Sequence, residues 1–405
     1  MNIITKYKKN DKFHTTLVNA IFQIKCDKDE IMALTILSRL LLKTNKKYNS
    51  EDIFSKEKLN RYIISYNVLN QSINNVYFLN FSLLLPNEGI ISDFNLNRAV
   101  NFMLDTIYDT NIYDEELFER EKRIYTEYLL DNYKNIEFIA EKNMLDILDQ
   151  DCIFNKIKYK DIENIKDLTI DNVIDLYNKY IKNIIPKIFV YGNMEKDNIE
   201  NIFNNYFKNK KLKSYKLLND YNVFYNNANY VEKTDYTKFN QSIVYKIYNI
   251  KDYNEDDFYK LYLINQILYN SYSDLLFDNL RKKYNLVYSC GSSIMIRNGL
   301  LIIKALTSKN NIKLAKIVID KTIKELINID DYKDNINRII SRLENNLIRE
   351  KDNFYIEPTD IINNYFKSDI SSEKLLNILK SIRIDELKEC ISRLETKCTY
   401  VLEGV

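Results

Sequence analysis

Hydrophobic residues along this chain follow two periods, and each period predicts a different kind of element. Strand-like apolar runs predict β-strands over 15–25, 187–192 and 242–250, and the first run alternates as a half-buried strand does. Apolar positions three and four residues apart predict helices over about 29–43, 93–108, 114–132, 136–149 and 195–208. Two further pairs of strand-like runs predict hairpins across Asn74–Asn75 and across Arg297–Gly299.

Capping residues mark where several of these helices begin. Ser50 opens the segment SEDIF, and Thr169 opens TIDN before an apolar-periodic run. Asp256 opens a helix to about Asn270, and SDLLFDNLRKKY at 273–284 predicts another helix. The last residues, CTYVLEG, predict a final strand.

The order of elements repeats once, with a period of about 200 residues. Both halves run strand, helix, helix, hairpin, helices, strand. Between them, residues 209–229 are polar, basic and aperiodic, which is typical of a linker. We therefore expect an α+β fold of two similar domains in tandem, over 1–208 and 230–405, each with a mainly antiparallel sheet packed by helices.

The amino-acid composition limits which cellular environment and which classes of binding partner we expect for this protein. The 405 residues are 45% hydrophobic, which suffices for two full cores. With 59 basic and 57 acidic residues the charge is nearly balanced, so no nucleic-acid partner is indicated. The apolar runs are too short to span a membrane, and the first residues lack the apolar region of a signal peptide. Five cysteines without a CxxC motif indicate reduced thiols and a cytoplasmic protein.

A shortage of histidine limits the chemistry of the chain. Its single histidine, His14, precedes a strand-like run and has no acidic motif around it, so we expect it to be hydrogen-bonded or solvent-facing. A histidine-based zinc site needs two or three such residues. No cysteine pair has zinc-ligand spacing, since Cys390 and Cys398 are eight residues apart, and no glycine-rich phosphate motif occurs. No metal or cofactor is therefore expected in this chain.

Several stretches nevertheless resemble one large enzyme family. The most specific are DNLRKKYNLVYSCGSS at 278–293 and the run IENIKDLTIDNVIDLYNKYI followed by KIFVYGNM. DKFHTTLVNAIFQIK, the helix ending LLLKTNKKY and the segment FEREKRIYTEYLLDN add to the likeness. They resemble the pitrilysin/insulinase-type zinc metallopeptidases, in particular the short two-domain bacterial members related to mitochondrial processing peptidase. The likeness covers nearly the whole chain.

The zinc motif of that family is degenerate here. Active members carry HxxEH on a helix, where two histidines at i and i+4 bind zinc and the glutamate activates water. When the family pattern is aligned with this sequence backwards from Tyr48, Thr35 and Arg39 occupy the two histidine positions, and Ser38 occupies the glutamate position.

The third zinc ligand of the family is a glutamate on a later helix. Glu127 lies near that position, but the closest register places Tyr128 there. From the sequence alone, an isolated glutamate of this kind is a solvated helix residue. The resemblance therefore implies zinc only in a partner subunit.

A second family motif is retained. The resemblance implies that Arg281 and Tyr288 hold the substrate backbone and stabilise the oxyanion, whereas the residues alone suggest a surface arginine and a strand-core tyrosine. The resemblance then implies a non-catalytic subunit of a heterodimer, which binds peptides or unstructured polypeptides in trans to a homologous HxxEH-bearing subunit. A homodimeric peptide-binding clamshell and a scaffold without a proteolytic role are the alternatives.

Overall fold

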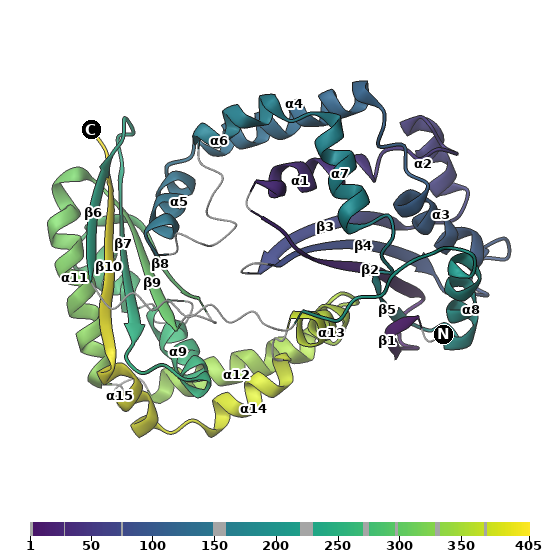
Figure 1. The fold of residues 1–405 in the computed structure, drawn as a ribbon. Helices are drawn as coiled ribbons and strands as arrows, with labels where there is room; N and C mark the ends of the chain where they lie inside the picture. Colours follow the sequence, from purple (N-terminus) through teal and green to yellow (C-terminus); the bar gives the residue numbers. More distant parts are fainter. Residues whose placement is uncertain are drawn as a thin grey trace. The chain divides into compact units, whose positions relative to one another are not determined.

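The computed structural model describes residues 3–27, 29–73, 76–148, 159–218, 230–269, 275–295, 299–328, 333–367 and 371–405. The chain divides into two compact units, one formed by Met1–Asp131 with Cys152–Tyr221 and the other by Asn132–Asp151 with Asn222–Val405. Each unit contains a five-stranded sheet packed by helices (Figure 1). The expected α+β fold of two similar domains is thus confirmed.

The sheet of the first unit has the strand order β1-β5-β2-β4-β3. Its strands are β1 (Ile4–Lys9), β5 (Lys187–Gly192), β2 (Thr15–Lys25), β4 (Val76–Pro86) and β3 (Ser65–Ile73). Only the β1–β5 pair is parallel, and the other pairs are antiparallel. The first expected hairpin is confirmed, because Ile73 pairs with Val76, while its turn at 74–75 lies outside the described residues.

The second sheet repeats this topology with the order β6-β10-β7-β9-β8. Its strands are β6 (Val231–Tyr236), β10 (Leu394–Glu403), β7 (Ser242–Ile250), β9 (Leu300–Thr307) and β8 (Val287–Met295). Again one outer pair, β6–β10, is parallel and the rest are antiparallel. The repeat in element order therefore extends to strand order and direction.

Two of the helices of the first unit, α2 and α7, begin at the expected capping residues. They are α1 (Glu30–Leu40), α2 (Glu51–Leu59), α3 (Leu96–Tyr108), α4 (Glu115–Asn132), α6 (Tyr159–Asn164), α7 (Ile170–Tyr180) and α8 (Lys196–Phe207). The Ser50 hydroxyl accepts a hydrogen bond from the Ile53 amide at 3.3 Å, and Thr169 forms a capping box with Asn172. Both contacts satisfy amide groups that a helix N-terminus leaves unpaired.

The helices of the second unit cover both faces of its sheet. They are α5 (Ile136–Leu148), α9 (Glu255–Leu268), α10 (Leu275–Phe277), α11 (Ile312–Glu325), α12 (Lys333–Glu350), α13 (Ile356–Lys367), α14 (Ser372–Ser381) and α15 (Ile384–Ser392). The helix expected over 273–284 consists of α10 followed by a π-helical turn over Asp278–Lys283. Within the described ranges, no helix is both long and apolar enough to cross a membrane.

Helix α5 belongs to the second unit, although the sequence boundaries place it within 1–208. Its residues Ile136, Ala140, Met144 and Leu148 recur every four positions and pack on one face of β7, β9 and β10. The other face packs against helices that include α9 and α11. Strand β7 is therefore covered on both sides, which explains its nearly continuous burial.

The expected linker is in part attached to the first unit. Lys213 forms an isolated parallel bridge with Ile184, and the Tyr215 hydroxyl donates a hydrogen bond to the Ile21 carbonyl of β2 at 2.9 Å. The side chain of Gln23 also accepts a hydrogen bond from the Leu218 amide at 2.9 Å. Residues 209–218 thus lie along the sheet, and 219–229 lie outside the described residues.

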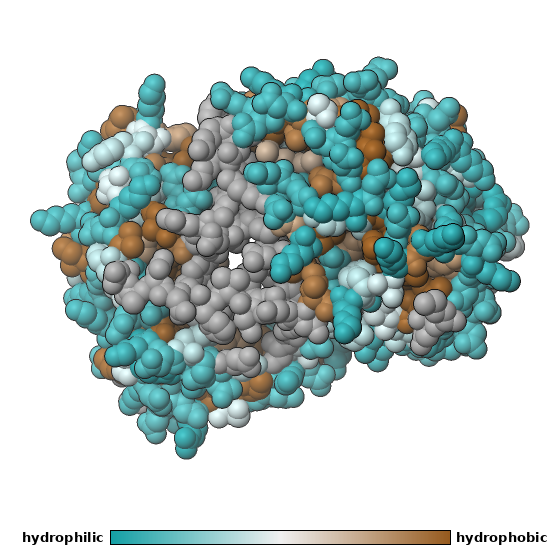
Figure 2. All heavy atoms as spheres, in the orientation of Figure 1, coloured by the Kyte–Doolittle hydropathy of each residue, from teal (hydrophilic) through white to brown (hydrophobic). Residues whose placement is uncertain are grey.

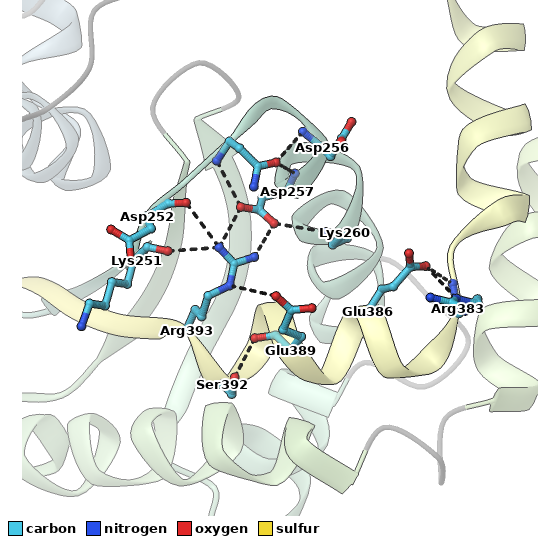
Figure 3. A network of polar contacts seen from close by, with 11 residues as sticks. Lys251, Asp252, Asp256, Asp257, Lys260, Arg383, Glu386, Glu389, Ser392 and Arg393 are labelled. Carbon is cyan, nitrogen blue, oxygen red and sulfur yellow. Dashed lines mark hydrogen bonds and ion pairs between the residues drawn. The ribbon is translucent and has the colours of Figure 1, made fainter.

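A buried ionic network fixes two loops of the second unit (Figure 3). Asp257, which is fully buried near the start of α9, closes a capping box with Asn254. Arg393, at the end of α15, donates to both carboxylate oxygens of Asp257 and to the carbonyls of Lys251 and Asp252. The guanidinium therefore joins the β7–α9 connection to the α15–β10 connection.

Burial by itself raises the pKa of Asp257, but several hydrogen bonds outweigh it. Donors from the Arg393 side chain, the Asn254 backbone and the Lys260 side chain favour the carboxylate, and the pKa falls below its ordinary value of 3.8. The network is thus built around an ionised Asp257.

We expect Arg393→Ala to lower the free energy of unfolding by about 3–5 kcal/mol, because the substitution leaves a buried carboxylate without its main partner. Arg383→Ala is the matched control, since Arg383 pairs with Glu386 at 3.7 Å and its side chain is 77% exposed. Urea unfolding should show a loss of under about 1 kcal/mol for the control. Equal losses for the two variants would contradict the role of Arg393.

The lowered pKa of Asp257 also gives its network a defined pH dependence. The ionised group stabilises the fold above the unfolded pKa of 3.8, and this contribution declines as the pH falls through the lower folded value. We expect the stability difference between the wild type and Asp257→Asn to be constant above about pH 5 and to shrink towards pH 2. Parallel stability curves in urea unfolding over this range would exclude the assignment.

Candidate functional site

The positions that correspond to the zinc motif lie on α1, a helix with eight buried residues out of eleven. The Thr35 hydroxyl donates to the Ile31 carbonyl at 2.9 Å. The Ser38 hydroxyl donates to the Thr35 carbonyl at 2.7 Å and accepts from the Asn70 side chain of β3 at 3.0 Å. Both hydroxyls are thus used within the fold, and α1 serves as a packed wall.

The third position, Arg39, forms an ion pair with a buried carboxylate. Its Nε donates to Glu121 Oε2 of α4 at 2.9 Å, and Glu121 is fully buried. Lys43 and Arg120 lie 3.5 and 3.4 Å from the other oxygen of Glu121. The Arg120 guanidinium also donates to Glu51. A fixed guanidinium, surrounded by further cations and acids, therefore stands where the second histidine would be.

The Glu51 side chain belongs to the same cluster. Burial raises the pKa of Glu51, but hydrogen bonds from Arg120 and Lys43 together with their positive charge lower it below its ordinary value. Glu51 is thus held as a carboxylate and balances part of the positive charge around Glu121. The cluster is an ionic contact between α1, α2 and α4 in which two carboxylates face three cations.

Sequence reasoning missed Glu121, although the sequence contains a signal for it. The buried residues of α4 include Leu117, Glu121, Tyr125 and Leu129, which recur every four residues on one face. An acid within an apolar stripe is either paired or functional, because an unpaired buried charge is strongly destabilising. Glu127, the acid that sequence reasoning singled out, does not lie on this stripe.

Glu127 and Tyr128 lie on exposed parts of α4. The Glu127 side chain is 67% exposed, lies 3.9 Å from Arg123 and lines an open cleft of about 1100 Å³ with residues of α2. Tyr128 is 59% exposed and stacks on Tyr125. Burial raises the pKa of Tyr125, and a hydrogen bond with Thr35 partly offsets the rise, so Tyr125 rather than Tyr128 faces α1.

The residues at this site do not fit the zinc ion of the metallopeptidases. Arg39 carries a permanent positive charge and no lone pair for a metal, and its pairing occupies the Glu121 carboxylate. Zinc ligands are thiolates, imidazoles and carboxylates. Among the described residues, no three His, Cys, Asp or Glu side chains lie together as a metal site. This chain therefore offers zinc no ligand set at α1 and α4.

Two of the remaining nucleophile candidates, Cys26 and Cys390, are unreactive in their surroundings. His14 is exposed, and Cys152 lies outside the described residues. The other cysteines, Cys26, Cys290, Cys390 and Cys398, are buried, and no disulfide joins any two of these four. Burial raises the pKa of both Cys26 and Cys390 to about 12, so these thiols stay protonated at neutral pH.

The second motif lies entirely in the second unit. Arg281 sits on the π-helical turn, and its Nη1 donates to the carbonyl of Val287 at 2.7 Å. Asn285, with φ of 51°, turns the chain between them. Elsewhere in the described chain the guanidinium has no further hydrogen-bond or ion-pair partner. Arg281 thus lies beside the start of β8 with most of its donors available.

Tyr288 follows Val287 and points out of the sheet core. The pairing with β9 skips one residue between Val287 and Ser289, so Tyr288 occupies a β-bulge. The side chain is 55% exposed, and its hydroxyl has no partner among the described residues. Bulges re-aim side chains and occur next to functional sites. The structure therefore brings Arg281 and Tyr288 together at an edge strand and excludes the strand-core position for Tyr288.

The surface gives no sign of a large apolar interface on the face drawn in Figure 2. Over the described residues of this face, hydrophilic side chains predominate, and hydrophobic side chains gather in small groups. Scattered apolar groups of this size are ordinary for a protein surface. The candidate site is therefore defined by polar groups at the start of β8.

Comparison with protein families gives a match over a range that contains Arg281 and Tyr288. Residues 167–343 match the family model described as the peptidase M16 inactive domain. The matched range includes the π-helical turn and β8, and it ends within α12. No curated protein sequence matches the chain.

Solved structures share the fold over the whole chain. A conserved protein from Enterococcus faecalis is 20% identical with a TM-score of 0.84, covering 100% of this chain and 98% of that one. A peptidase M16 inactive domain from Pseudomonas fluorescens is 11% identical with a TM-score of 0.73, covering 98% and 95%. The ferredoxin protease FusC, in complex with Arabidopsis ferredoxin, is 11% identical with a TM-score of 0.71, and the match covers 96% of this chain but 42% of that one.

We expect Glu121→Gln to lower the free energy of unfolding by about 3 kcal/mol, because it removes the charge that Arg39 and Lys43 share. Glu127→Gln on the same helix is the matched control and should change stability by under about 1 kcal/mol. Urea unfolding of both variants separates a buried ionic contact from a solvated one. A neutral effect of Glu121→Gln would show that the cluster does not hold α1 to α4.

Proposed function

We propose that this chain, which matches the M16 inactive domain over residues 167–343 and lacks a histidine zinc motif, is the non-catalytic subunit of a heterodimeric zinc peptidase. In this assembly a homologous partner carries HxxEH and cleaves peptides, while Arg281 and Tyr288 bind the substrate in trans. The observation that carries the proposal is the contrast between the two motifs. The polar groups of Ser38 and Arg39 on α1 are engaged in contacts within the fold. Arg281 and Tyr288 are exposed and have hydrogen-bond donors without a partner among the described residues.

The chemistry of the pair suits a peptide held near a developing negative charge. A guanidinium remains charged at all relevant pH values and presents several donors in one plane. A phenol adds one directed hydrogen bond, and two such donors suffice to bind a tetrahedral oxyanion. The contact between Arg281 and the Val287 carbonyl fixes the guanidinium next to Tyr288.

The edge of the second sheet supports an extended peptide as the substrate. Strand β8 is the last strand of its sheet, so one of its sides has backbone amides and carbonyls without a strand partner. An extended peptide adds to such an edge through main-chain hydrogen bonds, which tolerate many sequences. We therefore infer peptides or unstructured segments as substrates, rather than folded domains.

The length of the ferredoxin protease supports a two-chain assembly, whereas the other two similar structures match this chain over 98% and 95% of their own length. This chain corresponds to only 42% of the ferredoxin protease that shares its fold. That protease thus contains further chain beyond the matched part, and here a second subunit would supply it. Zinc would then be held by the partner, and we place the pair in the cytoplasm without a membrane or nucleic-acid partner.

A pull-down of the tagged chain from its native cytosol, followed by zinc analysis, tests the assembly. A homologous HxxEH-bearing partner with about one zinc ion per pair would support the proposal. A zinc-free homodimer that binds peptide would favour a peptide-binding clamshell instead. Zinc bound in stoichiometric amount to the pure chain, with cleavage that a chelator stops, would overturn the proposal.

In the isolated complex, we expect Arg281→Ala and Tyr288→Phe each to lower peptide turnover by at least about tenfold, because each removes a donor to the substrate. Lys283→Ala and Tyr284→Phe are neighbouring controls with exposed side chains, and we expect them to retain turnover. Steady-state kinetics on a fluorogenic peptide measures the effect. Unchanged turnover in the Arg281 and Tyr288 variants would leave only a scaffold role.

A further inference from the structure

Helix α12 carries a row of three arginines along one side. Arg338, Arg342 and Arg349 follow at i, i+4 and i+11, and at about 100° per residue they fall within about 40° of the helix circumference. The amide side chain of Asn345 lies on the same side, between the second and third arginine. We call the surface formed by these four residues the arginine row.

The opposite side of α12 is held against the core of the second unit. Ile339 is buried in that core, and Ile336 and Leu343 pack against it. The helix contacts α9 and α14, which fixes its rotation about its own axis (Figure 1). The arginine row is therefore presented outward by packing, because the apolar side cannot turn away from the core.

The arginine row lines a pocket of about 390 Å³ together with Asn337 and Ser341 of the same helix. Arg338 and Arg349 are exposed, and neither has an ion-pair partner among the described residues. Arg342 is half-buried, and its guanidinium donates to the buried Gln266 of α9 at 2.6 Å.

The acids of α12 are Asp334, Glu344 and Glu350, and among the described contacts none of them forms an ion pair with Arg338 or Arg349. Glu344 lies on the flank of the helix and pairs with Lys380 of α14. Asp334 stands one turn before Arg338, and the described contacts contain no ion pair between them. The row therefore combines three positive charges with amide and hydroxyl groups, which is a chemistry suited to carboxylates.

The spacing of the row matches an extended chain. Along the helix axis, Arg338 and Arg349 are about 16 Å apart at 1.5 Å per residue. An extended peptide rises about 3.3 Å per residue, so about six residues span the row. Carboxylates spread over such a segment would each reach a guanidinium without the peptide folding.

Helix α9 connects the row to the edge strand of the candidate site. Gln266, which Arg342 contacts, lies three residues before Tyr269 at the end of α9. A Cβ atom on Gly291 of β8 would lie 3.7 Å from the Tyr269 ring, so this end of the helix reaches the strand that carries Tyr288. The row and the edge strand thus both lie beside α9, within the second unit.

We propose that the arginine row is a binding site for an acidic segment of the peptide substrate, outside the part held by Arg281 and Tyr288. This inference rests on the proposed function, which it deepens by naming the substrate class. A nucleic acid is the weaker candidate for the row. Its phosphates bind broad basic surfaces, whereas this chain has a net charge of only +2 and a single row of three arginines.

Fluorescence anisotropy of the purified full-length chain with two labelled peptides tests this site. One peptide carries four glutamates within six residues, and the other has glutamine at the same positions. We expect the acidic peptide to bind at least about tenfold more tightly at low salt, because each exposed ion pair adds a small and screened increment. The triple variant Arg338→Gln, Arg342→Gln and Arg349→Gln should remove the difference while the glutamine peptide still binds.

Lys313→Gln, Lys321→Gln and Lys324→Gln together form the matched control, because they remove the same charge from exposed positions of α11. This variant should keep the preference for the acidic peptide. Equal binding of both peptides by the wild type would overturn the acidic site and leave peptide binding by the edge strand intact. A single-stranded oligonucleotide that binds more tightly than the acidic peptide would overturn it in favour of nucleic acid.

Discussion

The structure depends on the need to cover both faces of each sheet. The central strands β2 and β7 are buried almost throughout, so neither face of either sheet can be left to water. In the second unit, α9 and α11 pack on one face, and α5 is brought from far away in the sequence to pack on the other. The same requirement keeps α1 in place after the zinc ligands are gone, because its apolar face still completes the first unit.

An ionic cluster occupies the place in the first unit where the resemblance would put a zinc site. A zinc site holds its helices through bonds from several side chains to one ion. Here Arg39, Lys43 and Arg120 surround Glu121, so direct charge pairs connect α1 to α4. Such a cluster holds the elements together, but its guanidinium and ammonium groups offer no ligand to a metal ion.

Local patterns predicted much of the fold because they act over short distances. The runs at 15–25, 187–192 and 242–250 form strands with those bounds, and Ser50 and Thr169 cap helices as expected. The strands β1 and β6 were missed, since ITKYKK and VEKTDY lie at sheet edges and carry little apolar pattern. The sequence pattern could not predict that α5 packs on the second sheet. Amphipathic spacing shows that a helix has an apolar side, but it does not show which sheet that side covers. A motif in the sequence singles out Arg281 and Tyr288 as candidates, whereas the bulge that exposes Tyr288 depends on pairing with β9.

The path of α5 also bears on how this chain came to be one polypeptide. If the two sheets descend from a duplicated ancestor, the present halves are no longer interchangeable with it. A piece ending at residue 208 would keep α5 with its row of Ile136, Ala140, Met144 and Leu148 exposed to water. A piece beginning at residue 230 would carry a sheet with one bare face. When the two pieces are mixed, they should reassociate, because α5 of the first piece can cover the bare face of the second sheet. In the intact chain the covalent connection makes this packing an intramolecular step.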